Sequence, residues 1–131
     1  MGAVGMCAER DETSGWVYIC TPEELTEGSW RRINVLYEGV SDSVVVLRYQ
    51  GAVQAFRNLC VHMPRSLDGE DGNIFDPATG HLRCSMHGIV YSPETGESLS
   101  DICRGKKLTS VRVIEHKSKL YLKDKRVKPD F

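Results

Sequence analysis

Two short cysteine–histidine pairs on a loop-rich stretch constrain the fold of this 131-residue chain more than any other feature. The first pair is Cys60-Val-His62 and the second is Cys84-Ser-Met-His87, with residues 63–83 between them. Glycine, proline, aspartate and asparagine accumulate from about residue 58 to residue 98, where no apolar pattern continues. A stretch this long without clear elements indicates either disorder or something other than a hydrophobic core that holds it. The two pairs therefore predict a metal centre.

The ligand types narrow the choice of metal. Two thiolates and two imidazoles can bind one zinc ion tetrahedrally, and this alternative stays open. Zinc fingers, however, usually group cysteine with cysteine and histidine with histidine, whereas each pair here holds one of each. The mixed pairing favours a [2Fe–2S] cluster in which Cys60 and Cys84 bind one iron and His62 and His87 bind the other. A nucleophilic Cys–His enzyme is disfavoured because it needs one activated thiol rather than two matched pairs.

The remainder of the chain has the pattern of an all-β, antiparallel domain over residues 16–125. Residues 1–15 are expected to form a flexible arm and residues 126–131 a C-terminal tail. Thr21, Pro22 and Glu24 predict one short helical turn. The expected strands are residues 16–20, 32–37, 43–49, 52–56, 108–114 and 120–122.

Composition excludes some classes of function. The net charge of −1 gives no reason to expect nucleic-acid binding. No apolar run approaches the roughly 18 residues that a membrane span needs, so no membrane partner is expected. The first residues show neither a basic region nor an apolar segment of a signal peptide, which predicts a cytoplasmic setting. Five cysteines cannot all pair, and cytosolic thiols stay reduced.

Charge is distributed unevenly along the chain. Residues 1–27 carry six acids and one base, whereas residues 99–128 carry ten bases and three acids. Two interpretations stay open. The basic flank steers an acidic redox partner, or it is only a solvated surface with a lysine-rich last strand.

The residues around the two pairs resemble the cluster-binding loops of Rieske proteins, and are most similar to those of soluble Rieske-type ferredoxins. The resemblance lies in Arg57-Asn-Leu-Cys-Val-His62, in Ser66-Leu-Asp-Gly69 and in Cys84-Ser-Met-His-Gly-Ile-Val-Tyr-Ser-Pro-Glu-Thr-Gly96. It implies a β-sandwich-like base domain with a small loop-rich cluster-binding subdomain over about residues 58–98. It also implies one [2Fe–2S] cluster per chain, and a second-sphere role for Tyr91, whose hydroxyl would bond a cysteine sulfur.

Some residues depart from the pattern of Rieske subunits of quinol-oxidising complexes. Pro64 and Met86 stand where those subunits carry a bracing disulfide, and Ile89 replaces a serine that bonds a bridging sulfide. Fewer hydrogen bonds to the sulfurs predict a reduction potential in the lower part of the Rieske range of roughly −150 to +300 mV. The role of residues 71–80 is left open.

The resemblance implies a carrier of single electrons between a reductase and a terminal oxygenase or other oxidoreductase. No catalytic activity of its own is expected, because the chain shows no second iron site with two histidines and a carboxylate. A permanently docked electron-transfer subunit of a larger complex and a zinc-stabilised binding module are the alternatives.

The other cysteines and histidines are not expected to be ligands. Cys20 and Cys103 are predicted to be small buried side chains and Cys7 an idle thiol, whereas His81 and His116 are predicted to lie at the surface.

Overall fold

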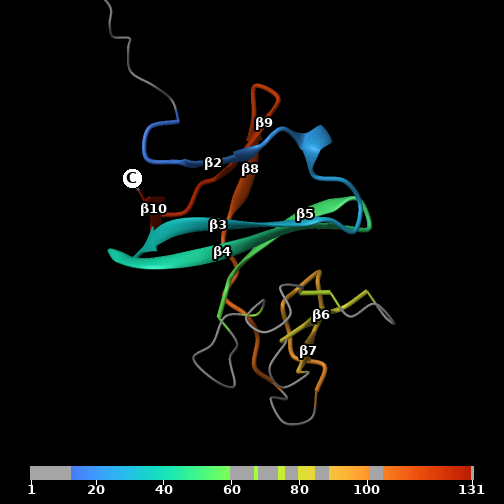
Figure 1. The fold of residues 1–131 in the computed structure, drawn as a ribbon. Coiled ribbons are helices and arrows are strands. Elements are labelled where there is room, and N and C mark those ends of the chain that lie inside the picture. Colours follow the sequence, from blue (N-terminus) through green and yellow to red (C-terminus); the bar gives the residue numbers. More distant parts are fainter. Residues whose placement is uncertain are drawn as a thin grey trace, which may run out of the picture.

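The computed structural model describes residues 13–59, 67, 74–75, 80–84, 89–100 and 105–130. These residues form two larger antiparallel sheets and, below them in Figure 1, a short two-stranded one. The sequence-based prediction of an all-β fold is confirmed. The part of the chain described contains no helix long and apolar enough to cross a membrane.

The four-stranded sheet has the order β10-β3-β4-β5. Strand β3 (Trp30–Tyr37) pairs with β4 (Val40–Tyr49), which pairs with β5 (Ala52–Arg57). The turn from β4 to β5 places Gln50 and Gly51 at φ values of 51° and 82°. Two successive residues with positive φ match the right-handed twist of a tight hairpin. The strands expected over residues 43–49 and 52–56 therefore form a hairpin.

Strand β4 is buried on both faces. Residues Val44 to Leu47 have no exposed surface. Val44 and Val46 pack into an upper core beneath the three-stranded sheet, whereas Val45 and Leu47 pack into a lower core toward the loop-rich part. Side chains of a strand alternate between its faces, so an unbroken apolar run is what a strand between two cores requires.

The three-stranded sheet has the order β2-β9-β8 and covers the upper core. It consists of β2 (Val17–Cys20), β8 (Val113–His116) and β9 (Lys119–Leu122). A short 3-10 helix, η1 (Pro22–Glu24), follows β2 as predicted, and Thr21 N donates a 2.9 Å hydrogen bond to Glu24 Oε1.

The single strand predicted over residues 108–114 divides in the structure. Thr109 O accepts a 2.8 Å hydrogen bond from Arg57 N, and Val111 N donates one of 2.9 Å to Ala55 O. These residues run along β5 before the chain enters β8. One extended run therefore pairs first with the four-stranded sheet and then with the three-stranded sheet. The regular alternation of apolar and polar residues along the run gave no sign of this change.

The C-terminal tail expected at residues 126–131 includes a short strand. Strand β10 (Val127–Pro129) pairs with β3, and Val127 is fully buried in the upper core. Its alternation is too short to be recognised as a strand, because only Val127 of the three residues points into the core.

Asp124 ties the start of β10 to the rest of the base. Its carboxylate accepts hydrogen bonds from Arg126 Nε at 2.9 Å and Arg126 Nη2 at 2.7 Å, and from the backbone N–H groups of Arg126 and Arg112. Arg126 Nη2 also donates to Ser110 O at 2.7 Å. The Arg126 guanidinium is the main cause that lowers the pKa of Asp124 to about 2.

Asp124→Asn is expected to lower the free energy of unfolding at pH 7 by about 1–2 kcal/mol. The folded-state pKa of Asp124 lies below its ordinary value of 3.8, so the charged form stabilises the fold above about pH 4, and this contribution falls as the pH drops toward 2. Urea denaturation followed by circular dichroism at several pH values measures it. Asp130→Asn, at an exposed position, is the control, and an equal loss in both variants contradicts the assignment.

Candidate metal centre

Of the four predicted ligands, Cys84 is the one that lies among the described residues. It directly follows β6 (Leu82–Arg83) and is completely buried. Its backbone N–H donates a 2.9 Å hydrogen bond to Ile89 O, just before β7 (Val90–Tyr91). This bond joins the two ends of the segment that contains His87. Cys60, His62 and His87 themselves lie outside the described residues.

Asn58 closes the other predicted loop in a corresponding way. It follows β5 and has only 2% of its surface exposed. Its Oδ1 accepts a 2.8 Å hydrogen bond from Leu67 N, and its Nδ2 donates a 3.0 Å bond to Ser43 Oγ on β4. Asn58 N also donates to Ser43 O at 2.9 Å. One amide side chain thus links the sheet to both ends of the segment that carries Cys60 and His62.

The ends of the two segments meet in one core. Leu67 and Cys84 belong to the same lower cluster of buried side chains, and neither has any exposed surface. The other buried members of that cluster include Phe56, Leu82, Ile89, Tyr91 and Leu108. The lower core, not the surface, therefore fixes where the two Cys/His segments begin and end.

Tyr91 lies in this core with no exposed surface. It stands opposite Leu82 in the β6–β7 pair and forms an isolated bridge with Ser98. A buried phenol at this place is compatible with a hydrogen bond to a cysteine sulfur, since a buried tyrosine hydroxyl usually has a partner. The role predicted for Tyr91 stays a prediction.

A tight turn after β7 covers the lower core. Ser92 Oγ accepts from the backbone N–H groups of Glu94 and Thr95, at 3.2 and 3.4 Å, and Gly96 N donates to Ser92 O at 2.7 Å. Gly96 has a φ of +81°, and a Cβ built on it would lie 2.8 Å from Phe56 Cε1 and 3.3 Å from Leu108 Cβ. Glycine is therefore required here both by the backbone and by the close approach of the Phe56 ring.

Gly96→Ala is expected to destabilise the fold by about 2–4 kcal/mol, from the strained positive φ and the displaced Phe56 ring together. Guanidinium denaturation of the cluster-loaded protein measures the change. Gly39→Ala is the matched control, because its φ of +85° imposes the same strain but nothing lies within 4 Å of its added Cβ. Equal losses in the two variants would show that contact with Phe56 contributes nothing.

Some of the other cysteines and histidines lie among the residues that the structure describes, and some lie outside them. Cys20 is 1% exposed in the upper core, which confirms its prediction as a core residue, and burial is the main cause that raises the pKa of its thiol. Cys7 and Cys103 lie outside the described residues. His81 and His116 are half-buried, and the His116 ring packs edge-on to Trp16 with centroids 5.6 Å apart.

Asn58 is the residue of this site that sequence reasoning missed. Its position two residues before Cys60 made it part of the motif without giving it a role. One signal was available in the sequence. Asn58 is a short polar residue between a strand with an apolar face and a pair of metal ligands, and such side chains commonly bond to the backbone of a nearby loop.

One known protein family matches most of this chain. Residues 15–115 match the family model of the Rieske [2Fe-2S] domain. The chain belongs to this family. This Rieske domain matches no curated protein sequence, so the family model and the solved structures are its points of reference.

Solved structures share the fold of this Rieske domain. It is similar to the ferredoxin of carbazole 1,9a-dioxygenase from Nocardioides aromaticivorans IC177, at 23% identity and a TM-score of 0.66, over 85% of this chain and 99% of that one. A complex of reduced oxygenase and oxidized ferredoxin in carbazole 1,9a-dioxygenase matches at 23% identity and 0.67, over 85% and 94%. A chain in the reduced complex between oxygenase and ferredoxin matches at 21% and 0.64, over 82% of this chain but 28% of that one.

The family binds a [2Fe–2S] cluster, and the described residues fit this cofactor. Cys84 places a thiol in a core from which water is excluded, at the closed end of a two-stranded hairpin. Asn58 and Leu67 anchor a second segment against the same core. The donor set of the sequence, two cysteines and two histidines in mixed pairs, is the one that Rieske clusters use.

Proposed function

We propose that this Rieske domain is a ferredoxin that carries single electrons between a reductase and a terminal oxygenase or other oxidoreductase. The observation that carries the proposal is the extent of the structural match. The fold corresponds to nearly the whole of a ferredoxin chain, 99% of it, and to only a 28% portion of a longer chain. A ferredoxin chain that consists of one such domain is therefore the better model for this Rieske domain.

The proposed ligands are Cys60, His62, Cys84 and His87, one thiolate and one imidazole from each loop. Burial of Cys84 and the hydrogen bonds that close the two loops support this assignment. Tyr91 is proposed to donate from its hydroxyl to a cysteine sulfur, which its place in the same core supports. We further propose that the functional domain spans residues 16–125 together with β10, which pairs with β3. We also propose that the protein acts in the cytoplasm, where free thiols such as Cys20 persist.

When bound, the cluster supplies a centre that accepts and releases one electron. The residues of the chain hold it and control its surroundings. Leu67, Cys84 and Tyr91, all fully buried, exclude water from the base of the site. The hydrogen bonds of Asn58 and of Cys84 N keep the ends of both loops in place, so that little reorganisation accompanies a change of charge.

Anaerobic redox titration of the purified protein tests the function. We expect about two irons and two acid-labile sulfides per chain, and reversible uptake of about one electron, followed by visible absorption and electron paramagnetic resonance. Colourless protein with about one zinc per chain would overturn the proposal in favour of a binding module. Co-purification with a partner that persists in high salt would instead indicate a permanently docked subunit.

A further inference from the structure

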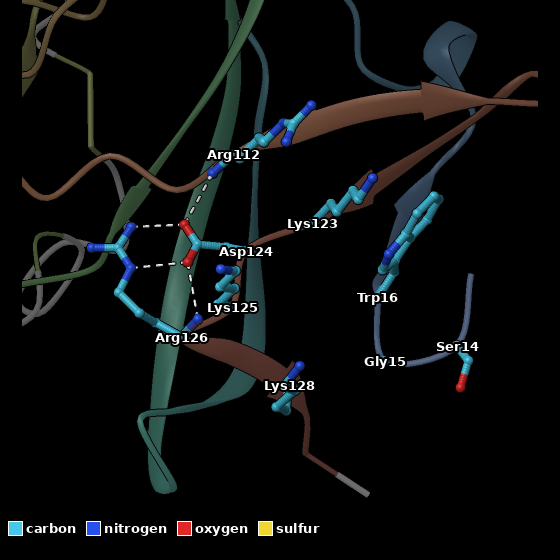
Figure 2. A pocket seen from close by; sticks show the side chains of 9 residues that line it. All are labelled: Ser14, Gly15, Trp16, Arg112, Lys123, Asp124, Lys125, Arg126 and Lys128. Atoms are coloured by element: carbon cyan, nitrogen blue, oxygen red, sulfur yellow. Dashed lines mark hydrogen bonds and ion pairs between the residues drawn. The ribbon is translucent and has the colours of Figure 1, made fainter. Parts of the chain in front are cut away.

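A basic groove lies on the side of the base domain, where the segment before β2 faces the ends of β9 and β10. Figure 2 shows the side chains that line this groove of about 560 Å³. None of the lining residues comes from β6, β7 or the turn that follows them. The groove is therefore a surface separate from the described part of the cluster site (Figure 1).

The cations of the groove outnumber its single carboxylate. Five basic side chains line it, from Arg112, Lys123, Lys125, Arg126 and Lys128. Asp124 is the carboxylate, and Arg126 together with two backbone N–H groups occupies both of its oxygens. Within the described chain, neither Arg112, Lys125 nor Lys128 forms an ion pair. Among the described residues, the positive charges of Arg112, Lys125 and Lys128 are therefore left without a paired carboxylate.

The walls give the groove a fixed shape. Trp16 forms one wall, held by edge-on contacts with His116 and Tyr121, each with ring centroids 5.6 Å apart. Lys123 Nζ lies 4.8 Å from the centroid of the Trp16 ring. Lys128 approaches from β10, with its Nζ 3.8 Å from the place of a Cβ at Gly15. The cations thus line a groove with an aromatic wall rather than projecting singly from an open surface.

We propose that the basic groove binds a carboxylate-rich segment of a protein partner. Charge complementarity selects an anion, and the arrangement of donors selects its kind. A compact phosphate favours several converging backbone N–H groups. Here the N–H groups of Arg112 and Arg126 are already bonded to Asp124, and the available donors are long side chains on separate segments. Such donors suit a string of carboxylates, and the Trp16 ring can pack against the methylene groups between them.

The basic groove gives the proposed electron carrier a second contact surface, whatever its redox partners are. Exposed charge pairs give rapid, salt-sensitive and readily reversible association. A partner segment held in the basic groove leaves the described edge of the cluster-binding region uncovered. The protein can therefore stay attached to one partner while its cluster end contacts another.

Fluorescence anisotropy with a fluorescein-labelled hexaglutamate peptide tests the proposal on the cluster-loaded full chain. We expect saturable binding that weakens steeply between 20 and 200 mM salt, on the order of tenfold or more, and none to a hexaglutamine peptide. Lys125→Glu/Lys128→Glu is expected to weaken binding at least about tenfold. Lys106→Glu/Lys119→Glu makes the same change in net charge at exposed positions outside the groove, and is expected to change affinity less than about twofold.

Several results would overturn the proposal. Equal weakening by the two double variants would show that net charge, not the groove, attracts the peptide. Inorganic tripolyphosphate that displaces the peptide at much lower concentration than free hexaglutamate would point to a phosphate site. Stronger binding to vesicles of phosphatidylserine and phosphatidylcholine would point to a lipid surface. An unchanged visible spectrum in each variant shows that the cluster domain is intact.

Discussion

Cys84→Ala is expected to yield protein with less than about one tenth of the normal iron and inorganic sulfide, whereas Cys20→Ala keeps both. Cys60 and Cys84 would hold the same iron of the cluster, so loss of Cys84 would leave that iron with only one of its two thiolate ligands. Cys84 is fully enclosed by apolar side chains of the lower core, and solvent cannot substitute there. Elemental analysis and visible absorption of anaerobically purified protein measure the effect.

Cys20 is a closely matched control. It is the other described cysteine, it is equally buried, and it lies in the upper core on β2. Its raised thiol pKa keeps it protonated at neutral pH, as expected for a core side chain that binds no metal. Cys20→Ala is expected to cost only about 1 kcal/mol in stability. A normal metal content in Cys84→Ala would contradict the ligand assignment, and loss of metal in both variants would contradict the distinction between the cores.

Asn58→Leu is expected to lower the free energy of unfolding by about 2–4 kcal/mol and to speed release of the cluster to a chelator. Leucine has the same number and branching of side-chain heavy atoms but neither accepts from Leu67 N nor donates to Ser43 Oγ. The Leu67 N–H group then stays buried without this partner, and the segment that carries Cys60 and His62 loses its tie to the sheet. Urea denaturation and the rate of bleaching in excess chelator measure the two effects.

Ser43→Ala separates the two bonds of the Asn58 side chain. It removes the acceptor for Asn58 Nδ2 but keeps the bond from Leu67 N, so a smaller loss of about 1 kcal/mol is expected, with slow release of the cluster preserved. If Asn58→Leu and Ser43→Ala release the cluster equally fast, closure of the loop by Leu67 is not what retains it. If neither variant changes the rate, Asn58 is only a structural residue of the sheet.

The strands whose apolar residues follow a regular pattern could be predicted from the sequence. The apolar run of Val44 to Leu47 and the turn at Gly51 were sufficient for the β4–β5 hairpin. The turn between β8 and β9 consists of Lys117 and Ser118, which both adopt positive φ, at 52° and 64°. Neither is a residue typical of that conformation, so their types gave no signal.

The sequence indicated the chemistry of the candidate site but not the hydrogen bonds that anchor its loops. The pairing of Cys60 with His62 and of Cys84 with His87 indicates a cluster from ligand type and spacing alone. The links of Asn58 to Leu67 and Ser43, in contrast, join residues whose contact depends on the folded path of the chain. The same holds for the basic groove, which gathers Trp16 and Lys128 from opposite ends of the sequence.

The two buried faces of β4 have a consequence for how the sheet finds its alignment. A shift of one residue normally exposes the apolar side of a strand, and this penalty selects the correct pairing. Along Val44 to Leu47 such a shift would only exchange one set of aliphatic side chains for another. The alignment must then be selected at the two ends of this run. At one end lies the tight turn in which Gln50 and Gly51 have positive φ, and at the other lies the polar contact of Ser43 with Asn58. The contact that ties the segment carrying Cys60 and His62 to the sheet therefore also discriminates against mispaired strands while the protein folds.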